Sequence, residues 1–87
     1  MKEENKQKFH VKLPEEIENG VYANAVSVHI NNNECVIDMA YTLPNTSEPV
    51  IKIVSRVNMS HKTAESFLNV LSNAILDWKN KSKTANN

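Results

Sequence analysis

The stretch 34–43 shows the clearest alternation of apolar and polar positions in the chain. Asp38 and Thr42 occupy even-numbered positions, and successive side chains of a β-strand point to opposite faces. The pattern therefore predicts a strand with one apolar face, and we place it at the centre of an antiparallel sheet because both flanking segments can pair with it apolar against apolar. The apolar face consists of Cys35, Ile37, Met39, Tyr41 and Leu43.

Three other segments, 9–13, 21–30 and 50–59, alternate in the same way and complete a sheet of about four strands. Pro14 ends the first segment, and residues 15–20 predict a turn, with one helical turn closed by Gly20. A two-residue loop at Asn32 and Asn33 makes apolar side chains face each other in the hairpin that follows. Asparagine tolerates the positive φ of a type I′ turn, so we expect that turn here.

A connecting loop at 44–49 leads to the last strand, and matching apolar positions gives its register. The register sets Asp38 opposite Arg56 on one neighbouring strand and opposite Ser27 on the other. The opposite charges of Asp38 and Arg56 were not used to choose this register, so their pairing supports it. These three residues are a candidate polar site at which Arg56 binds a carboxylate or phosphate. The alternative, which we favour, is an ion pair that fixes the register. The predicted apolar pairs are Cys35–Met59, Ile37–Val57, Tyr41–Ile53 and Leu43–Ile51.

Residues 61–79 have the periodicity of an amphipathic helix, and Ser60 is a natural N-cap before it. Leu76 falls on the polar side, and this packing does not explain it. The expected architecture is α+β, an antiparallel sheet of about four strands packed on one face by a long C-terminal amphipathic helix. It forms a single domain at 9–79 with disordered tails at 1–8 and 80–87. The helix's apolar stripe comprises Ala64, Phe67, Leu68, Val70, Leu71, Ala74, Ile75 and Trp78.

Size and charge narrow the classes of function. The chain has 87 residues with ten basic and ten acidic side chains, so no general charge attracts nucleic acid or anionic membrane. Cys35 is the single cysteine, which suits a reducing compartment, and the N-terminus has no apolar run resembling a signal peptide. No stretch approaches the length of a membrane helix. We expect a cytoplasmic protein with no membrane partner.

A folded core of ~70 residues is marginal by itself, and no disulfide or metal cluster reinforces it, so a homodimer is expected. The face of the sheet away from the helix is rich in small apolar side chains where a solvent-facing strand would carry polar ones. Small side chains allow another sheet or backbone to approach closely, and we therefore predict the dimer face there. Its residues are Ala23, Ala25, Val36, Ala40, Val50 and Val54.

Other chemistry is not supported by the spacing of reactive residues. Cys35 and His29 lie on opposite faces of the predicted hairpin, so they cannot form a thiol–imidazole dyad. His10, His29 and His61 fall on three separate elements without the spacing of metal ligands. With no nucleophile beside a base, no carboxylate pair and no glycine-rich phosphate loop, we expect no enzyme, no metal and no cofactor.

Several motifs carry a resemblance to a family. The pieces are Leu13-Pro14-Glu15-Glu16, Gly20-Val21-Tyr22-Ala23-Asn24, Glu34 with Asp38 in the central strand, and Arg56-Val57-Asn58-Met59-Ser60. With them the chain resembles short bacterial and archaeal proteins known only as a domain of unknown function, which implies the fold above and no particular activity. The sequence departs from the family pattern at Cys35, Met39 and His61. The layout of strands followed by a long helix is also similar to export chaperones of the SecB type, an analogy of fold alone.

The function expected from these observations is that of a small, cytoplasmic, homodimeric binding or accessory module without enzymatic activity. Its protein partner is not identified by the sequence. A nucleic-acid-associated protein and a small SecB-like chaperone or holdase are the alternatives.

Overall fold

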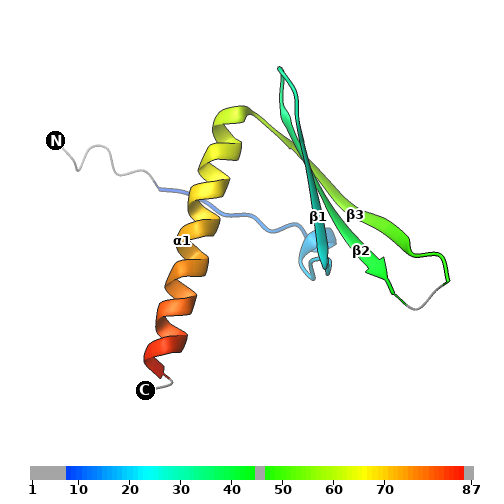
Figure 1. Cartoon of the computed structure of the whole chain (residues 1–87). Helices are drawn as coiled ribbons and strands as arrows, with labels where there is room; N and C mark the ends of the chain where they lie inside the picture. The colour runs from blue at the N-terminus through cyan, green and yellow to red at the C-terminus, as the bar shows by residue number, and fades with distance from the viewer. Residues whose placement is uncertain (1–7, 45–46, 86–87) are drawn as a thin grey trace.

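The computed structural model describes residues 8–44 and 47–85. A 3₁₀ turn, η2 (Glu15–Ile17), precedes strands β1 (Ala25–Ile30), β2 (Cys35–Leu43) and β3 (Val50–Met59), and helix α1 (His61–Ala85) follows them. The strands form an antiparallel sheet in the order β1-β2-β3, with the helix to one side of it (Figure 1). The α+β class and the central position of β2 are confirmed.

The fourth strand expected at 9–13 is not confirmed, because the sheet has three strands. Phe9 and Val11 are among the most exposed apolar side chains of the chain, and β1 begins at Ala25 rather than at residue 21. Alternation shows that a segment would have one apolar face as a strand, but it does not show whether the segment pairs with an edge of the sheet. The turn closed by glycine is confirmed: Gly20 has a φ of 72°, and its N–H donates to the carbonyl oxygen of Ile17 at 3.0 Å.

The hairpin between β1 and β2 has the predicted two-residue loop, and its register places Ile30 opposite Cys35. The predicted type I′ turn is wrong, since no described non-glycine residue has positive φ. The side-chain oxygen of Asn31 instead accepts hydrogen bonds from the N–H groups of Asn33 and Glu34, at 2.8 and 2.9 Å. This Asx-type turn satisfies the loop backbone without a left-handed residue.

A β-bulge divides the β2–β3 pairing in two. Beside the hairpin, Ile37 is opposite Val57 as predicted, but a register shift at Met39/Ala40 leaves Val54 between two pairs. Beyond the shift, the predicted pairs Tyr41–Ile53 and Leu43–Ile51 are wrong. The structure has Ala40–Ile53, Tyr41–Lys52, Thr42–Ile51 and Leu43–Val50.

Helix α1 follows β3 after one residue, Ser60, whose Oγ accepts the N–H of Thr63 at 3.1 Å as the predicted N-cap. The helix continues to Ala85, so residues 80–85, expected in a disordered tail, are helical. Tail residues 1–7 and 86–87, and loop residues 45–46, lie outside the described residues.

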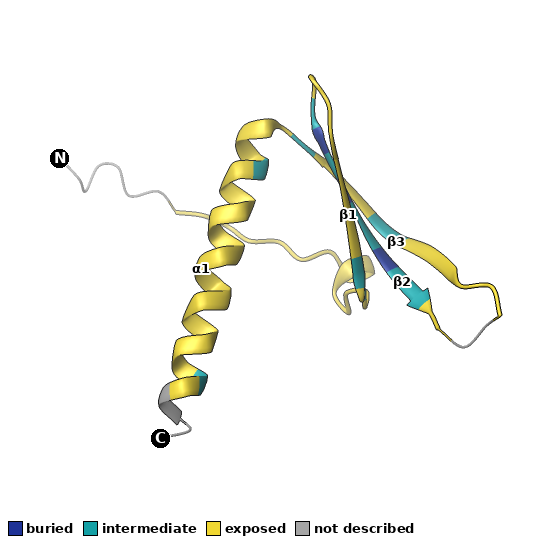
Figure 2. Ribbon diagram, viewed as in Figure 1, coloured by how far each residue is buried: buried dark blue, intermediate teal, exposed yellow. Residues whose placement is uncertain are grey.

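The helix and the sheet diverge instead of closing on each other (Figure 1). Within the described residues, buried side chains are confined to β2, at Cys35, Ile37 and Ala40, and nearly the whole helix is exposed (Figure 2). The radius of gyration is 17.9 Å, compared with about 12 Å for a compact domain of this length. The predicted packing of the helix on the sheet is therefore present only near the β3–α1 junction.

Candidate functional site

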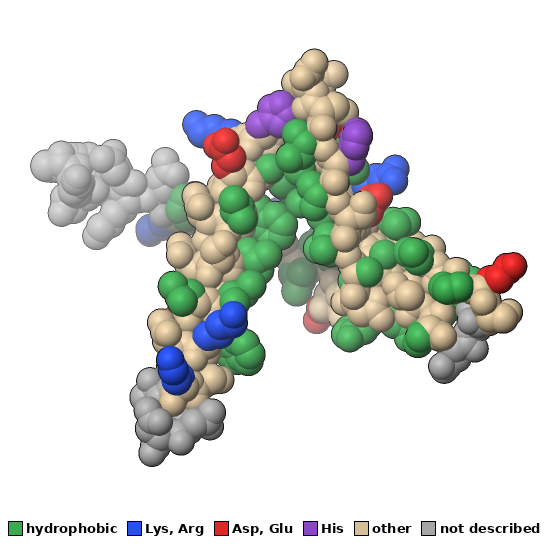
Figure 3. Space-filling view, in the orientation of Figure 1, with side chains coloured by type: hydrophobic (Ala, Val, Ile, Leu, Met, Phe, Trp, Pro, Cys, Tyr) green, Lys and Arg blue, Asp and Glu red, His purple; other side chains and the backbone are tan. Residues whose placement is uncertain are grey.

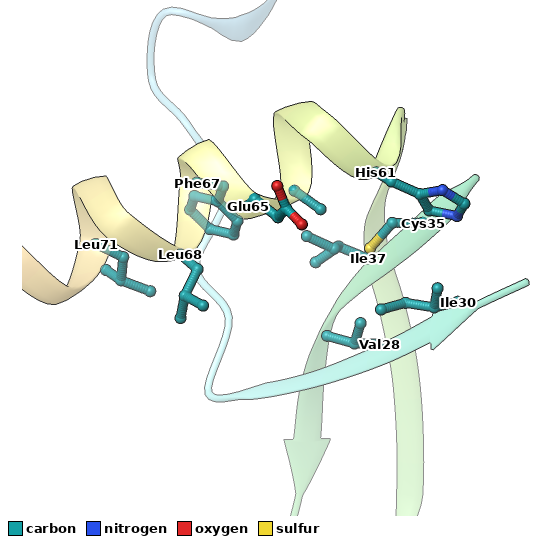
Figure 4. Close-up of a pocket in the computed structure, with 10 residues that line it drawn as sticks. Val28, Ile30, Cys35, Ile37, His61, Glu65, Phe67, Leu68 and Leu71 are labelled. Carbon is teal, nitrogen blue, oxygen red and sulfur yellow. The ribbon is translucent and has the colours of Figure 1, made fainter.

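The space between the sheet and α1 is an open apolar groove with a volume of about 470 Å³ at its narrower, junction end. Figure 4 shows Phe67, Leu68 and Leu71 projecting from the helix toward the strands. We call this space the interlayer groove, and its wider part adds Ala23, Asn24, Ala25, Val26 and Met39. The sheet side of the narrow part is formed by Val28, Ile30, Cys35 and Ile37, and Ala64, Glu65 and His61 complete the helix side.

Side chains on the helix side of the groove are far less covered than those of a folded core. Phe67 retains 38% of its accessible surface and Leu71 retains 46%. In space-filling view, apolar side chains form a band along the side of the helix that faces the sheet (Figure 3). A groove with so many apolar atoms facing water requires an additional apolar surface to cover it.

Two polar residues mark the junction end of the groove. His61, the first residue of α1, places Nε2 2.7 Å from the carbonyl oxygen of Asn31, so Nε2 carries the proton and donates. Glu65 lies one turn further along the helix and also lines the groove. The hydrogen bond of His61 ties the start of the helix to the β1–β2 turn.

His61 and Cys35 both line the groove, a neighbourhood that the sequence analysis missed because these residues are 26 positions apart in sequence. His29 faces away from Cys35, as expected, since it is opposite Val36 in the register. The Cys35 side chain is 2% exposed. A thiol buried among apolar neighbours is a packing residue and a poor nucleophile.

The ion pair predicted across the sheet is present and bidentate. Arg56 Nε donates to Asp38 Oδ1 at 2.6 Å, and its second nitrogen donates to Oδ2 at 2.9 Å. Asp38 alternates with the groove residues Ile37 and Met39, so the pair lies on the face away from α1. The hydrogen bonds and positive charge of Arg56 lower the pKa of Asp38, and Asp38 raises the pKa of Arg56.

Register also brings Ser27 opposite Asp38, as predicted. The two oxygens of Asp38 are both engaged by Arg56, which leaves the guanidinium committed to an internal partner. Arg56 is 61% exposed and Asp38 16% exposed, so the pair is open on the arginine side only. This geometry fits a pair that fixes the register better than it fits an anion-binding site.

The residues predicted as a dimer face do not all share one face. Ala25 and Ala40 are directly opposite each other, and Val36 lies on their side of β2 by alternation. The bulge places Val50 opposite Leu43 on the groove face, and Ala23 and Ala25 both line the groove. Val54 is the extra residue of the bulge. Ile51 and Ile53 occupy the far face instead, a change that one inserted residue causes and that pattern matching cannot detect.

Asn24 and Tyr22 lie just before β1, and both are exposed. Asn24 binds the backbone of Thr42 through its side chain, accepting from its N–H at 2.9 Å and donating to its carbonyl oxygen at 3.4 Å. The Tyr22 ring meets Tyr41 edge to face, with ring centres 6.1 Å apart. These contacts extend the β1–β2 pairing to residues that precede β1. Asn24 and Tyr22 therefore have a structural role.

The fold and the groove define a small α+β protein in which a three-stranded antiparallel sheet and a long C-terminal helix share an uncovered apolar space. Residues 1–84 match the family model of DUF3467, a protein family of unknown function, and the chain belongs to this family. No curated protein and no solved structure matches the chain. Among the described helices, none has the length and apolar character needed to cross a membrane.

Proposed function

We propose that this protein is a non-enzymatic binding or accessory module that acts as a homodimer. The observation that carries the proposal is the interlayer groove, whose apolar side chains are left facing water within a single chain. Hydrophobic burial is the main favourable term in folding, so a chain that leaves its apolar stripe uncovered gains most from association.

The amount of exposed surface supports this proposal. The chain exposes 8144 Å², whereas a compact monomer of 9.8 kDa exposes about 5,200 Å². Apolar side chains of the groove contribute to this excess, since Phe67 is 38% exposed and Leu71 is 46% exposed. Obligate homodimers bury about 2,000–5,000 Å² in total, an area that the excess on two chains can supply.

The chemistry of the groove supports binding rather than catalysis. Its lining side chains are mostly apolar, and Nε2 of the lining histidine, His61, donates to the backbone oxygen of Asn31. Arg56 and Asp38, the strongest charged pair, satisfy each other on the other face. The buried thiol of Cys35 suits a reducing compartment, and we place the module in the cytoplasm.

Sedimentation equilibrium of the full chain at tens of micromolar tests the homodimer. We expect the mass of two chains, and a monomer throughout this range would refute the proposal. A holdase is the second candidate, because an open apolar groove is also a surface on which an unfolded chain can dock. Suppression of aggregation of a heat-unfolded client would favour the holdase, and salt-dependent retention on DNA or RNA would favour the nucleic-acid alternative.

A further inference from the structure

Helix α1 carries a row of side chains that begins in the interlayer groove and continues beyond it. Leu68 is 63% exposed and Leu76 is 57% exposed, and they lie eight positions apart with Ser72 midway. Residues four apart on a helix lie nearly above one another, so these three side chains form one row. The row includes Leu76, which packing against the chain's own sheet leaves unexplained.

The two halves of the row match about Ser72: a leucine lies four positions away on each side, and a charged residue lies seven positions away on each side. Glu65 lies seven positions before Ser72, and Lys79 lies seven positions after it. The spacings along 65, 68, 72, 76 and 79 are three, four, four and three residues, so these positions lie on one side of the helix and form a seam at which a second helix can pack. A seam that carries an acidic residue at one end and a basic residue at the other matches a second copy of itself when the two helices run in opposite directions.

Antiparallel pairing about a two-fold axis at Ser72 accounts for each residue of this row. Leu68 of one chain meets Leu76 of the second copy, once on each side of the axis, and Glu65 meets Lys79 at both ends. Ser72 meets Ser72 at the centre, where a small side chain lets the helices approach closely. An isologous contact of this kind closes with two chains and leaves no free copy of the surface.

The same crossing fills the interlayer groove. Helix α1 has 25 residues and is about 37 Å long, while its groove-lining positions end at Leu71. The C-terminal half, with Ile75 and Trp78, extends beyond the groove of its own chain and is exposed. In the antiparallel arrangement this half lies beside the N-terminal half of the other helix, next to the other chain's groove.

We infer that the occupant of the interlayer groove is a second copy of this chain, whose α1 crosses the first α1 antiparallel at Ser72. The inference rests on the homodimer proposed above and identifies the surfaces that meet. It is supported by the charge order along the row, the uncovered half of α1 and the area available for burial.

A cysteine placed on the two-fold axis tests the crossing directly. In a Cys35→Ala background, Ser72→Cys brings two thiols together, and mild oxidation is expected to convert most of the chain to a disulfide-linked dimer on a non-reducing gel. Disulfides require Cα atoms within about 7 Å of each other. Ser66→Cys is the matched control, because two-fold-related copies of residue 66 are about 18 Å apart along the axis and face away from the seam. The control should not crosslink.

Charge reversal provides a second test that keeps Cys35 in place. Glu65→Lys and Lys79→Glu should each weaken dimerisation about tenfold, because symmetry places every charge pair in the interface twice. The double variant should return to within about threefold of the parent. Lys81→Glu, on the other side of the helix, is the control and should change the dimer dissociation constant less than about threefold.

The two tests separate this inference from the proposal on which it rests. A parent protein that sediments as a dimer, while Ser72→Cys fails to crosslink and the double charge reversal does not restore affinity, overturns the helix crossing and leaves the homodimer standing. A monomeric parent overturns both. Equal crosslinking of Ser72→Cys and Ser66→Cys would also overturn the crossing, since it would show contact without a fixed register.

Discussion

The imidazole Nε2 of His61 donates to the carbonyl oxygen of Asn31 across 2.7 Å, joining the first residue of α1 to the turn between β1 and β2. Asn31 uses its side-chain oxygen to close that turn and its main-chain oxygen to hold the helix. The orientation of α1 relative to the sheet therefore depends on the hairpin as well as on β3.

Replacing His61 tests this contact. His61→Ala removes the donor and should lower the free energy of unfolding by about 1 kcal/mol, the usual net value of one hydrogen bond. Urea unfolding measures the change in the free energy of unfolding, and hydrogen exchange of the first helical turn should accelerate. Lys62→Ala, the neighbouring exposed residue, is the control. Equal small losses in both variants would show that the bond does not hold the helix.

Acid stability should report the Asp38–Arg56 pair. Arg56 lowers the pKa of Asp38 in the folded chain, so the unfolded chain binds more protons as the pH falls. The stabilisation is complete above the ordinary aspartate pKa of about 3.9 and is lost as the pH falls from there through the folded-state pKa. Arg56→Gln should lose less stability than the parent across this window, measured as melting temperature against pH. Lys52→Gln should keep the parental profile, and an unchanged profile for Arg56→Gln would contradict the pairing in solution.

Leu71 reports whether the groove is closed in solution. The side chain lines both parts of the groove but is 46% exposed in one chain. If a second copy covers it, Leu71→Ala should cost ~2–5 kcal/mol, the value for a buried leucine. Val70→Ala, one position away and outside the groove lining, should cost less than ~0.5 kcal/mol. Thermal unfolding at several protein concentrations measures both, and similar small losses would mean that the groove stays open.

Two surfaces compete as the dimer interface, and one charged residue on each separates them. Leu68→Lys places a charge on the seam of α1, and Ile51→Lys places one on the far face of the sheet. We expect Leu68→Lys to give monomers in sedimentation and Ile51→Lys to remain dimeric. The reverse result would return the interface to the far face. Ala40→Lys is unsuited to this comparison, since Ala40 is 3% exposed in the single chain and the lysine would disturb folding.

The sequence predicted the elements that local pattern determines. Apolar alternation located β2 and the hairpin register, and Ser60 marked the start of the helix. It also placed Asp38 opposite Arg56, because that part of the register lies on the hairpin side of the bulge. These features follow from side-chain period and capping, which depend on residues close in sequence.

The errors arise where a distant partner or an irregularity decides the outcome. One extra residue at Val54 reverses the faces of the first half of β3, and alternation carries no sign of it. The Phe9 segment has the pattern of a strand but pairs with neither outer edge of the three-stranded sheet. Periodicity showed which side of α1 is apolar, but it cannot show whether a helix covers its own sheet or another copy's.

Ser60 is the whole connection between β3 and α1, since the strand ends at Met59 and the helix begins at His61. Because the helix is long and is joined to the sheet through one residue, a 10° change in its orientation at that residue moves the far end of the ~37 Å helix by about 6 Å. Small adjustments of backbone torsion at Ser60 would therefore open or narrow the interlayer groove, with the largest displacement at the C-terminal end of α1. The width available to anything that enters the groove is set at this junction, by the backbone of Ser60 and by the hydrogen bond from His61 to Asn31.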